Sequence, residues 1–138
     1  MRVALVGPPQ SGKSTLLSAV GGKGVRAGGA GVVEEVVPVP DERLDWLTEL
    51  YKPNKLVHAT VDCLDLPGIS FEDEHTRSAA RRLFGQVRTV DMFVIVVKAY
   101  GGGVNPAKAL TELRPEFLLA DLELVTTSID KLEKKTKK

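Results

Sequence analysis

Residues near the N-terminus have the types and the spacing of a loop that binds phosphate. Gly7, Gly12, Lys13 and Ser14 complete the pattern G-x-x-x-x-G-K-[ST]. Glycines let the backbone approach a ligand without a Cβ clash, so several N–H groups can converge on an anion. The pattern predicts a triphosphate-binding loop made of Gly7, Pro8, Pro9, Gln10, Ser11, Gly12, Lys13, Ser14 and Thr15.

Two side chains of this loop have distinct predicted tasks. Lys13 would bring a positive charge to the β- and γ-phosphates, and Ser14 would place its hydroxyl on the Mg²⁺ ion that bridges them. Apolar residues 3–6 predict a buried strand before the loop, and the apolar residues 16, 17, 19 and 20 predict a helix after it. The N-terminus of that helix would favour an anion at the same point.

A second candidate for chemistry is the segment Asp65-Leu66-Pro67-Gly68, at the end of a predicted strand over residues 60–66. In P-loop NTPases, an acid at the end of a buried strand lies beside the magnesium ion, and the glycine of D-x-x-G donates its N–H to the γ-phosphate. We therefore predict Asp65 as the magnesium acid. Asp62 lacks a glycine at the required spacing, so it does not fit this role.

Between these two motifs, the sequence predicts a strand over residues 32–37 that is an edge strand or an exposed one, because Glu34 and Glu35 interrupt it. Asp41 is predicted to cap a helix that ends at Tyr51. Trp46 lies beside the apolar face of this helix and is expected to pack in the core, with a base-stacking platform as the alternative.

Two segments resemble the switch segments of a P-loop GTPase. Residues 21–31 are rich in glycine, and we expect them to be mobile without a ligand. No threonine or serine occurs between Ser18 and Thr48, which argues against γ-phosphate sensing in this region. Residues 70–76 are polar and predict a flexible second switch.

The second half of the chain predicts a helix over residues 76–89, a strand buried on both faces over 90–97, and a helix from Pro115 to the end. The arginines of the helix over residues 76–89 are predicted to form a solvated basic face, and an arginine finger is the alternative. The last helix has a heptad seam, which predicts a coiled coil for its second half and either a coiled coil or packing on the sheet for its first half. The seam consists of Leu118, Leu122, Val125, Ile129 and Leu132.

Length and composition indicate one globular domain. The chain has 138 residues and a formal net charge of +1, so the overall charge does not favour nucleic acid. Five lysines and two acids in residues 130–138 indicate a solvated helix end or a site for an acidic partner. Cys63 is the single cysteine and is expected to be a buried thiol, while neither histidine has metal-ligand spacing. The sequence has no signal peptide and no membrane-spanning run, which predicts a cytoplasmic protein.

Several stretches resemble the YchF / Obg-like ATPase family of translation-associated P-loop NTPases. They are Val37-Pro-Val-Pro-Asp-Glu-Arg-Leu-Asp-Trp-Leu47, Tyr51-Lys-Pro-Asn-Lys55, Ala59-Thr60 and Asp62-Cys-Leu-Asp-Leu-Pro-Gly68. Thr111-Glu-Leu113 and Leu119-Ala-Asp-Leu-Glu123 resemble the entry into that family's coiled-coil insertion. The resemblance implies that the ribosome is the partner.

The resemblance also bears on catalysis. Ile69 stands where Ras-like enzymes have the glutamine that orients the attacking water, and an apolar side chain cannot hold water by hydrogen bonding. The base-recognition motif, N-K-x-D or the family's N-M-x-E, does not occur in the chain. We therefore expect the chain to be an N-terminal part of a longer protein or a reduced relative, and the residues do not rank ATP against GTP.

Together these features predict a three-layer α/β P-loop fold with a mostly parallel, incomplete sheet, a partial nucleotide-binding domain over residues 1–110 and a coiled-coil helix over 111–138. The predicted activity is Mg²⁺-dependent GTP or ATP binding with slow hydrolysis, for which Lys13, Gly68 and Ile69 are the candidate catalytic positions. A non-hydrolysing nucleotide-binding module that acts through its heptad helix is the alternative. A kinase-like transferase is a third reading, for which the sequence offers no acceptor-binding or lid residues.

Overall fold

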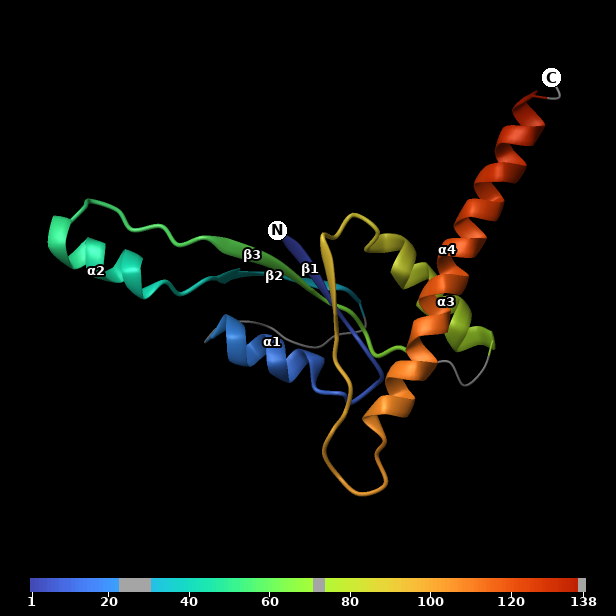
Figure 1. The fold of residues 1–138 in the computed structure, drawn as a ribbon, viewed down its shortest axis with the longest axis horizontal. Helices are drawn as coiled ribbons and strands as arrows, with labels where there is room; N and C mark the ends of the chain where they lie inside the picture. Colours follow the sequence, from blue (N-terminus) through green and yellow to red (C-terminus); the bar gives the residue numbers. More distant parts are fainter. Residues whose placement is uncertain (23–30, 71–73, 137–138) are drawn as a thin grey trace.

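The computed structural model describes residues 1–22, 31–70 and 74–136 and has an α/β architecture (Figure 1). Its four-stranded sheet has the order β2-β3-β1-β4. The elements are β1 (Arg2–Val6), α1 (Lys13–Gly21), β2 (Val33–Pro38), α2 (Glu42–Tyr51), β3 (Thr60–Asp65), α3 (Glu74–Gln86), β4 (Met92–Ile95) and α4 (Pro106–Thr136).

The sheet is mostly parallel, as predicted. β1 pairs in parallel with β3 on one side and β4 on the other, while β2 runs antiparallel to β3 at the edge. Leu5 pairs with Asp65, and Val6 pairs with Ile95. The carboxyl ends of the three parallel strands therefore lie at one edge of the sheet, where ligands bind in open α/β sheets.

Helices cover both faces of the sheet. The side chains of β1 point alternately to the two faces, so they pack against helices on each side. Ala4 and Val6 pack in a cluster with residues of α3 and α4, whereas Leu5 packs with Leu17 of α1. The result is the predicted three-layer arrangement, with α1 on one side and α3 and α4 on the other (Figure 1).

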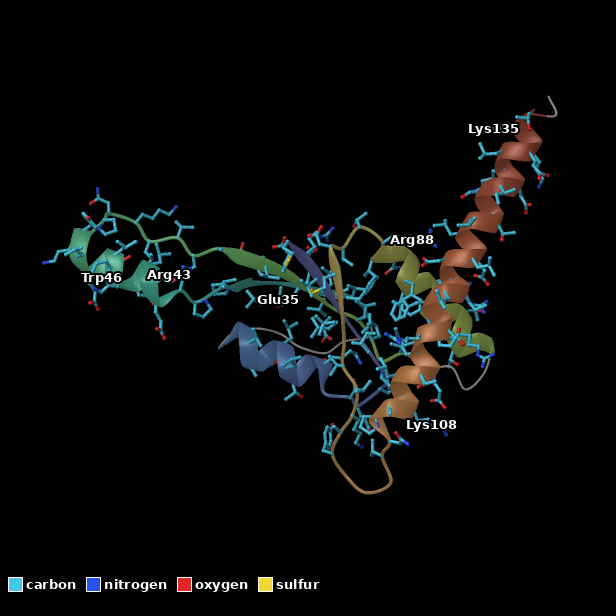
Figure 2. All side chains as sticks on the ribbon, viewed as in Figure 1. Glu35, Arg43, Trp46, Arg88, Lys108 and Lys135 are labelled. Atoms are coloured by element: carbon cyan, nitrogen blue, oxygen red, sulfur yellow. The ribbon has the colours of Figure 1, made fainter. Side chains whose placement is uncertain are left out.

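The β2–α2–β3 segment forms an arm that extends away from the rest of the fold (Figure 1). Asp41 caps α2 as predicted, since its side chain accepts a hydrogen bond from the Arg43 N–H. The prediction that Trp46 packs in the core is wrong, because α2 lies at the far end of the arm and Trp46 is 61% exposed (Figure 2). The apolar spacing of residues 44–51 predicted the helix α2, but it did not show whether another element packs on its apolar face.

The prediction of a strand buried on both faces over residues 90–97 is also wrong. β4 is shorter and lies at an edge of the described sheet, where Met92 is 48% and Phe93 is 40% exposed. An apolar run shows that a strand is favoured, but its burial depends on the neighbouring elements.

The last helix starts earlier than predicted. α4 begins at Pro106, and Pro115 lies inside it. The Asn105 side chain accepts a hydrogen bond from the Lys108 N–H at 3.1 Å, which is a helix cap, and proline is favoured at the first helical position. Asn105-Pro106 is therefore the start signal of α4. None of the helices within the described ranges has the length and apolar character needed to cross a membrane.

Candidate phosphate-binding site

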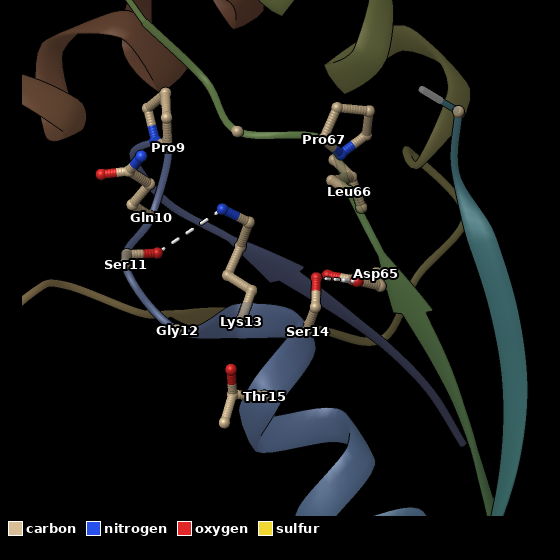
Figure 3. Close-up of a pocket in the computed structure, with 12 residues that line it drawn as sticks. Pro9, Gln10, Ser11, Gly12, Lys13, Ser14, Thr15, Asp65, Leu66 and Pro67 are labelled. Atoms are coloured by element: carbon tan, nitrogen blue, oxygen red, sulfur yellow. Dashed lines mark hydrogen bonds between the residues drawn. The ribbon is translucent and has the colours of Figure 1, made fainter. Parts of the chain in front are cut away.

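The predicted loop and the D-x-x-G segment meet at a pocket of about 340 Å³ (Figure 3). The pocket lies where β1 and β3 end side by side in the sheet. The described residues that line it are Pro9, Gln10, Ser11, Gly12, Lys13, Ser14, Thr15, Gly31, Asp65, Leu66, Pro67 and Gly68. The structure thus brings together two motifs that are fifty residues apart in the chain.

Backbone conformation gives the loop its shape. Gly12, with φ +100, immediately precedes α1, and Gln10 has φ +56, which is the left-handed region. A Cβ added to Gly7 would lie 2.1 Å from the Val96 carbonyl oxygen, so this position requires glycine. Among the described residues, no side chain caps the N-terminus of α1, which begins at the pocket. The first N–H groups of a helix are the kind of donors that an anion binds.

The Lys13 side chain folds back over the loop. Its Nζ donates hydrogen bonds to the carbonyl oxygens of Gly7 at 3.0 Å and Pro8 at 2.9 Å, and it lies 3.5 Å from Ser11 Oγ (Figure 3). Burial lowers the pKa of the Lys13 ammonium, and the nearby Asp65 carboxylate partly offsets this effect. The loop therefore holds a cation ready beside the pocket, and a phosphate would replace its carbonyl partners.

Ser14 and Asp65 are directly connected. The Ser14 hydroxyl donates to Asp65 Oδ2 at 2.6 Å, and Asp65 is buried (Figure 3). Hydroxyl and carboxylate oxygens are the ligands that Mg²⁺ prefers. In the described part of the chain, no three His, Cys, Asp or Glu side chains gather as a metal site. The Ser14 hydroxyl and the Asp65 carboxylate thus have the ligand chemistry that fits a magnesium ion.

Gly68 lies against the loop. A Cβ at this position would be 2.6 Å from Pro9 Cα, and the next residue, Ile69, donates its N–H to the Gly7 carbonyl at 3.0 Å. The D-x-x-G segment is thus fixed to the phosphate loop by close backbone contact.

Ile69 is not brought to the pocket. Its side chain is 3% exposed and packs in the core cluster with Phe84 and Ala120, on the side of the sheet that α3 and α4 cover. Gly7 and Pro8 do not line the pocket either. Gly7 lies against the Val96 carbonyl, and the carbonyl oxygens of Gly7 and Pro8 both accept hydrogen bonds from the Lys13 ammonium.

Some residues of the site gave little signal in the sequence. Leu66 and Pro67 line the pocket because they lie inside D-x-x-G, so the motif could have identified them. Gly31 also lines it, but residues 23–30 of the predicted first switch lie outside the described residues. Residues 71–73 of the predicted second switch lie outside them as well. Tyr100 contacts the loop at Gln10, and no motif pointed to it.

This strand–loop–helix unit, with an acid at the end of the neighbouring strand, defines a P-loop nucleotide-binding fold. A family model described as 50S ribosome-binding GTPase matches residues 2–128. The chain therefore belongs to this family of GTPase domains.

Relatives of known description agree with this assignment. The chain is 30% identical to a ribosome-binding ATPase YchF from Pasteurella multocida over 149 residues, which is 99% of this chain and 41% of the relative. It is 30% identical to an Obg-like ATPase 1 from Oryza sativa subsp. indica, over 100% of this chain and 38% of the relative. It is 32% identical to an Obg-like ATPase 1 from Schizosaccharomyces pombe, over 99% and 38%. The resemblance to the YchF / Obg-like family is confirmed, and the chain spans about two fifths of the length of these relatives.

Proposed function

We propose that this chain binds a nucleoside triphosphate with Mg²⁺ in the pocket of Figure 3 and hydrolyses it slowly. The single observation that carries the proposal is the Ser14–Asp65 hydrogen bond of 2.6 Å beside the buried Lys13 ammonium. This arrangement supplies a cation for the phosphates and two oxygen ligands for a metal within one pocket.

Each residue has a task that follows from its position. Lys13 would exchange its carbonyl partners for phosphate oxygens, and the N-terminus of α1 would add N–H donors. Ser14 and Asp65 would hold Mg²⁺, which when bound would neutralise charge on the phosphates. Gly68, fixed against Pro9, would donate its N–H near the γ-phosphate.

The buried Ile69 supports slow hydrolysis. Positioning of the attacking water is one of the main contributions that an NTPase makes to phosphoryl transfer. At the position after D-x-x-G this chain has an apolar side chain that packs in the core, so this position offers no hydrogen bond to water. We therefore propose that the water is oriented by another group or by a partner.

The exposed seam of α4 favours a second candidate, a nucleotide-binding module that does not hydrolyse and that acts through this helix. Leu118 and Leu132, at the two ends of the seam, are 71% and 63% exposed. The helix extends beyond the sheet, with Lys135 near its tip (Figures 1 and 2). Such an apolar seam on a protruding helix is typical of coiled-coil pairing.

Phosphate release under steady-state conditions separates the two candidates. Wild-type protein and Lys13→Ala would be incubated with Mg²⁺ and either ATP or GTP, because the family model is described as a GTPase and the relatives are named ATPases. Release by the wild type above the Lys13→Ala background supports hydrolysis. Nucleotide binding without release above that background would support the non-hydrolysing module instead.

We also propose that the ribosome is the partner, which would place the chain in the cytoplasm. The support is the description of the family and the names of relatives such as the YchF of Pasteurella multocida. Co-sedimentation with purified ribosomes in the presence of nucleotide tests this partner. Recovery of the chain with the ribosomes, reduced for Lys13→Ala, is the expected result, and a chain that stays in the supernatant would contradict it.

A further inference from the structure

Tyr100 contacts the phosphate loop from outside the pocket. Its hydroxyl donates a hydrogen bond to the Gln10 carbonyl oxygen at 2.8 Å, across a separation of ninety residues in the chain. The contact arises because β4 lies parallel beside β1, so the segment after β4 leaves the sheet at the same edge as the phosphate loop. Tyr100 is not among the described residues that line the pocket, and the proposed function does not use it.

Gln10 is the strained position of the loop. Its φ of +56 lies in the left-handed region, which is unfavourable for a residue with a side chain. One other non-glycine residue of the described ranges has a positive φ, Lys52, which follows α2. An unfavourable backbone conformation persists where surrounding contacts hold it, and the Tyr100 hydroxyl is such a contact.

The hydrogen bond also determines which way a peptide group faces. In a trans peptide, the carbonyl of Gln10 and the N–H of Ser11 point in opposite directions. Because Tyr100 holds the carbonyl, the Ser11 N–H points the opposite way, and it donates a long bond of 3.4 Å to the Pro8 carbonyl of the same loop. A phosphate would have to replace this carbonyl as the acceptor. A rotated peptide would instead present a carbonyl oxygen to the phosphates and repel them.

Neighbouring residues hold the Tyr100 side chain. The Lys98 ammonium lies 5.0 Å from the centroid of the Tyr100 ring, which is within the range of a cation–π interaction. Gly101 follows with φ +87, a conformation that suits glycine and turns the backbone directly after the tyrosine.

We propose that Tyr100 is a positioning residue for phosphate recognition, whose hydroxyl fixes the Gln10–Ser11 peptide so that the Ser11 N–H faces the triphosphate. This inference rests on the proposed nucleotide binding. The segment after β4 would then hold the phosphate loop in place through the Tyr100 hydroxyl, which phenylalanine lacks.

The test compares Tyr100→Phe with Tyr51→Phe, because the chain has two tyrosines and Tyr51 lies on α2, at the far end of the arm. The dissociation rate of a fluorescent triphosphate would be measured by stopped flow. Loss of one neutral hydrogen bond corresponds to about a 2- to 12-fold change, so Tyr100→Phe should release nucleotide faster by that factor. Tyr51→Phe should behave as wild type. Thermal unfolding without nucleotide should show one cooperative transition for both variants, which checks that each protein is folded.

A second readout follows the hydroxyl itself. In the Tyr51→Phe protein Tyr100 is the single tyrosine, so ¹³C-tyrosine labelling gives one signal for the ring carbon that bears the hydroxyl. Saturating nucleotide should shift this signal, and the shift should be absent when Lys13→Ala is added.

The outcomes separate this inference from the proposed function. If Tyr100→Phe releases nucleotide at the wild-type rate, or if the Tyr100 signal does not respond to bound nucleotide, the inference is overturned while nucleotide binding stands. If the wild type binds no nucleotide more tightly than Lys13→Ala, the proposed function fails and this inference fails with it.

Discussion

Lys13 is a charged group that the fold holds largely out of water, and its protonation should control binding. Burial lowers its pKa below the ordinary 10.5, so the ammonium is lost as the pH rises through this lowered value. We expect the Kd for a triphosphate to begin rising at a pH below 10.5. Titration of binding from neutral to alkaline pH measures this onset, and Lys13→Arg is the control because arginine stays charged throughout. A wild-type Kd that stays flat up to 10.5 would show that the ammonium is not part of the site.

Gly68 tests whether the contact between the two motifs is as close as the structure indicates. A Cβ at this position would lie 2.6 Å from the Pro9 backbone, so Gly68→Ala must displace the phosphate loop. We expect a loss of about 1–3 kcal/mol in the free energy of unfolding, as for other overpacked sites, together with weaker nucleotide binding. Urea unfolding and a binding titration measure the two effects.

The matched control for this change is Gly85→Ala in α3, where an added Cβ would have no neighbour within 4 Å. Alanine is favoured over glycine inside a helix by about 0.5–1 kcal/mol, so this variant should be as stable as the wild type or more stable. Equal destabilisation by both substitutions would mean that Gly68 does not touch Pro9.

Where a motif fixes both residue type and spacing, the sequence predicted which side chains lie together at the pocket, while their roles stay predictions. Ser14 and Asp65 were predicted to share one metal, and their side chains do lie in hydrogen-bond contact. Ile69 could be assigned a position after D-x-x-G but not a direction, because the direction of a side chain depends on the packing of α3 and α4. Tyr100 could not be found, since its contact depends on how β4 lies beside β1.

Helices α3 and α4 are joined through aromatic and charged contacts. The rings of Phe84 and Phe117 lie with centroids 4.5 Å apart, and Arg81 pairs with Glu123 at 2.7 Å. Ile69, which directly follows the D-x-x-G segment, packs in the same core cluster as Phe84 of α3 and Ala120 of α4. The contribution of the contacts between α3 and α4 to the free energy of unfolding can be measured.

Truncation of Phe117 should weaken this contact measurably. Phe117 packs against the core cluster but is only partly buried, so we expect Phe117→Ala to cost about 2 kcal/mol, less than the 3–5 kcal/mol for a fully buried phenylalanine. Leu118→Ala is the neighbouring control, because Leu118 is 71% exposed and should change the free energy of unfolding by less than about 0.5 kcal/mol. Urea unfolding compares the two, and a Phe117→Ala protein as stable as Leu118→Ala would contradict the packing of α4 on α3.

Element types were easier to predict than their surroundings. Apart from the start of α4, periodicity identified the strands and helices within a few residues, and the glutamates of β2 predicted an edge or exposed strand, which agrees with its place at an edge of the described sheet. The same patterns failed for Trp46, for β4 and for the start of α4. In the first two cases, the apolar residues indicated that burial would be favourable, but they did not show whether another element packs on them. In the third case the cap at Asn105 outweighed the proline at 115.

The molecule as a whole combines a three-layer fold with two protruding parts, the α2 arm and the outer half of α4 (Figure 1). The order strand–loop–helix followed by D-x-x-G predicted the fold class, because a phosphate loop and a magnesium acid require parallel strands that end at the same edge. The protruding parts have large exposed apolar side chains, such as Trp46 and Leu118. The exposure of these side chains cannot be predicted from local sequence, because it depends on which other elements pack against them.

Equilibrium binding of a triphosphate in the presence of Mg²⁺ is the most direct test of the central claim, that this pocket binds a nucleotide. Isothermal titration of the wild-type chain with a non-hydrolysable ATP or GTP analogue should give saturable binding of one nucleotide per chain. Lys13→Ala should abolish it, and removal of Mg²⁺ or the change Ser14→Ala should weaken it. No saturable binding of either analogue, or binding that Lys13→Ala leaves unchanged, would contradict the account.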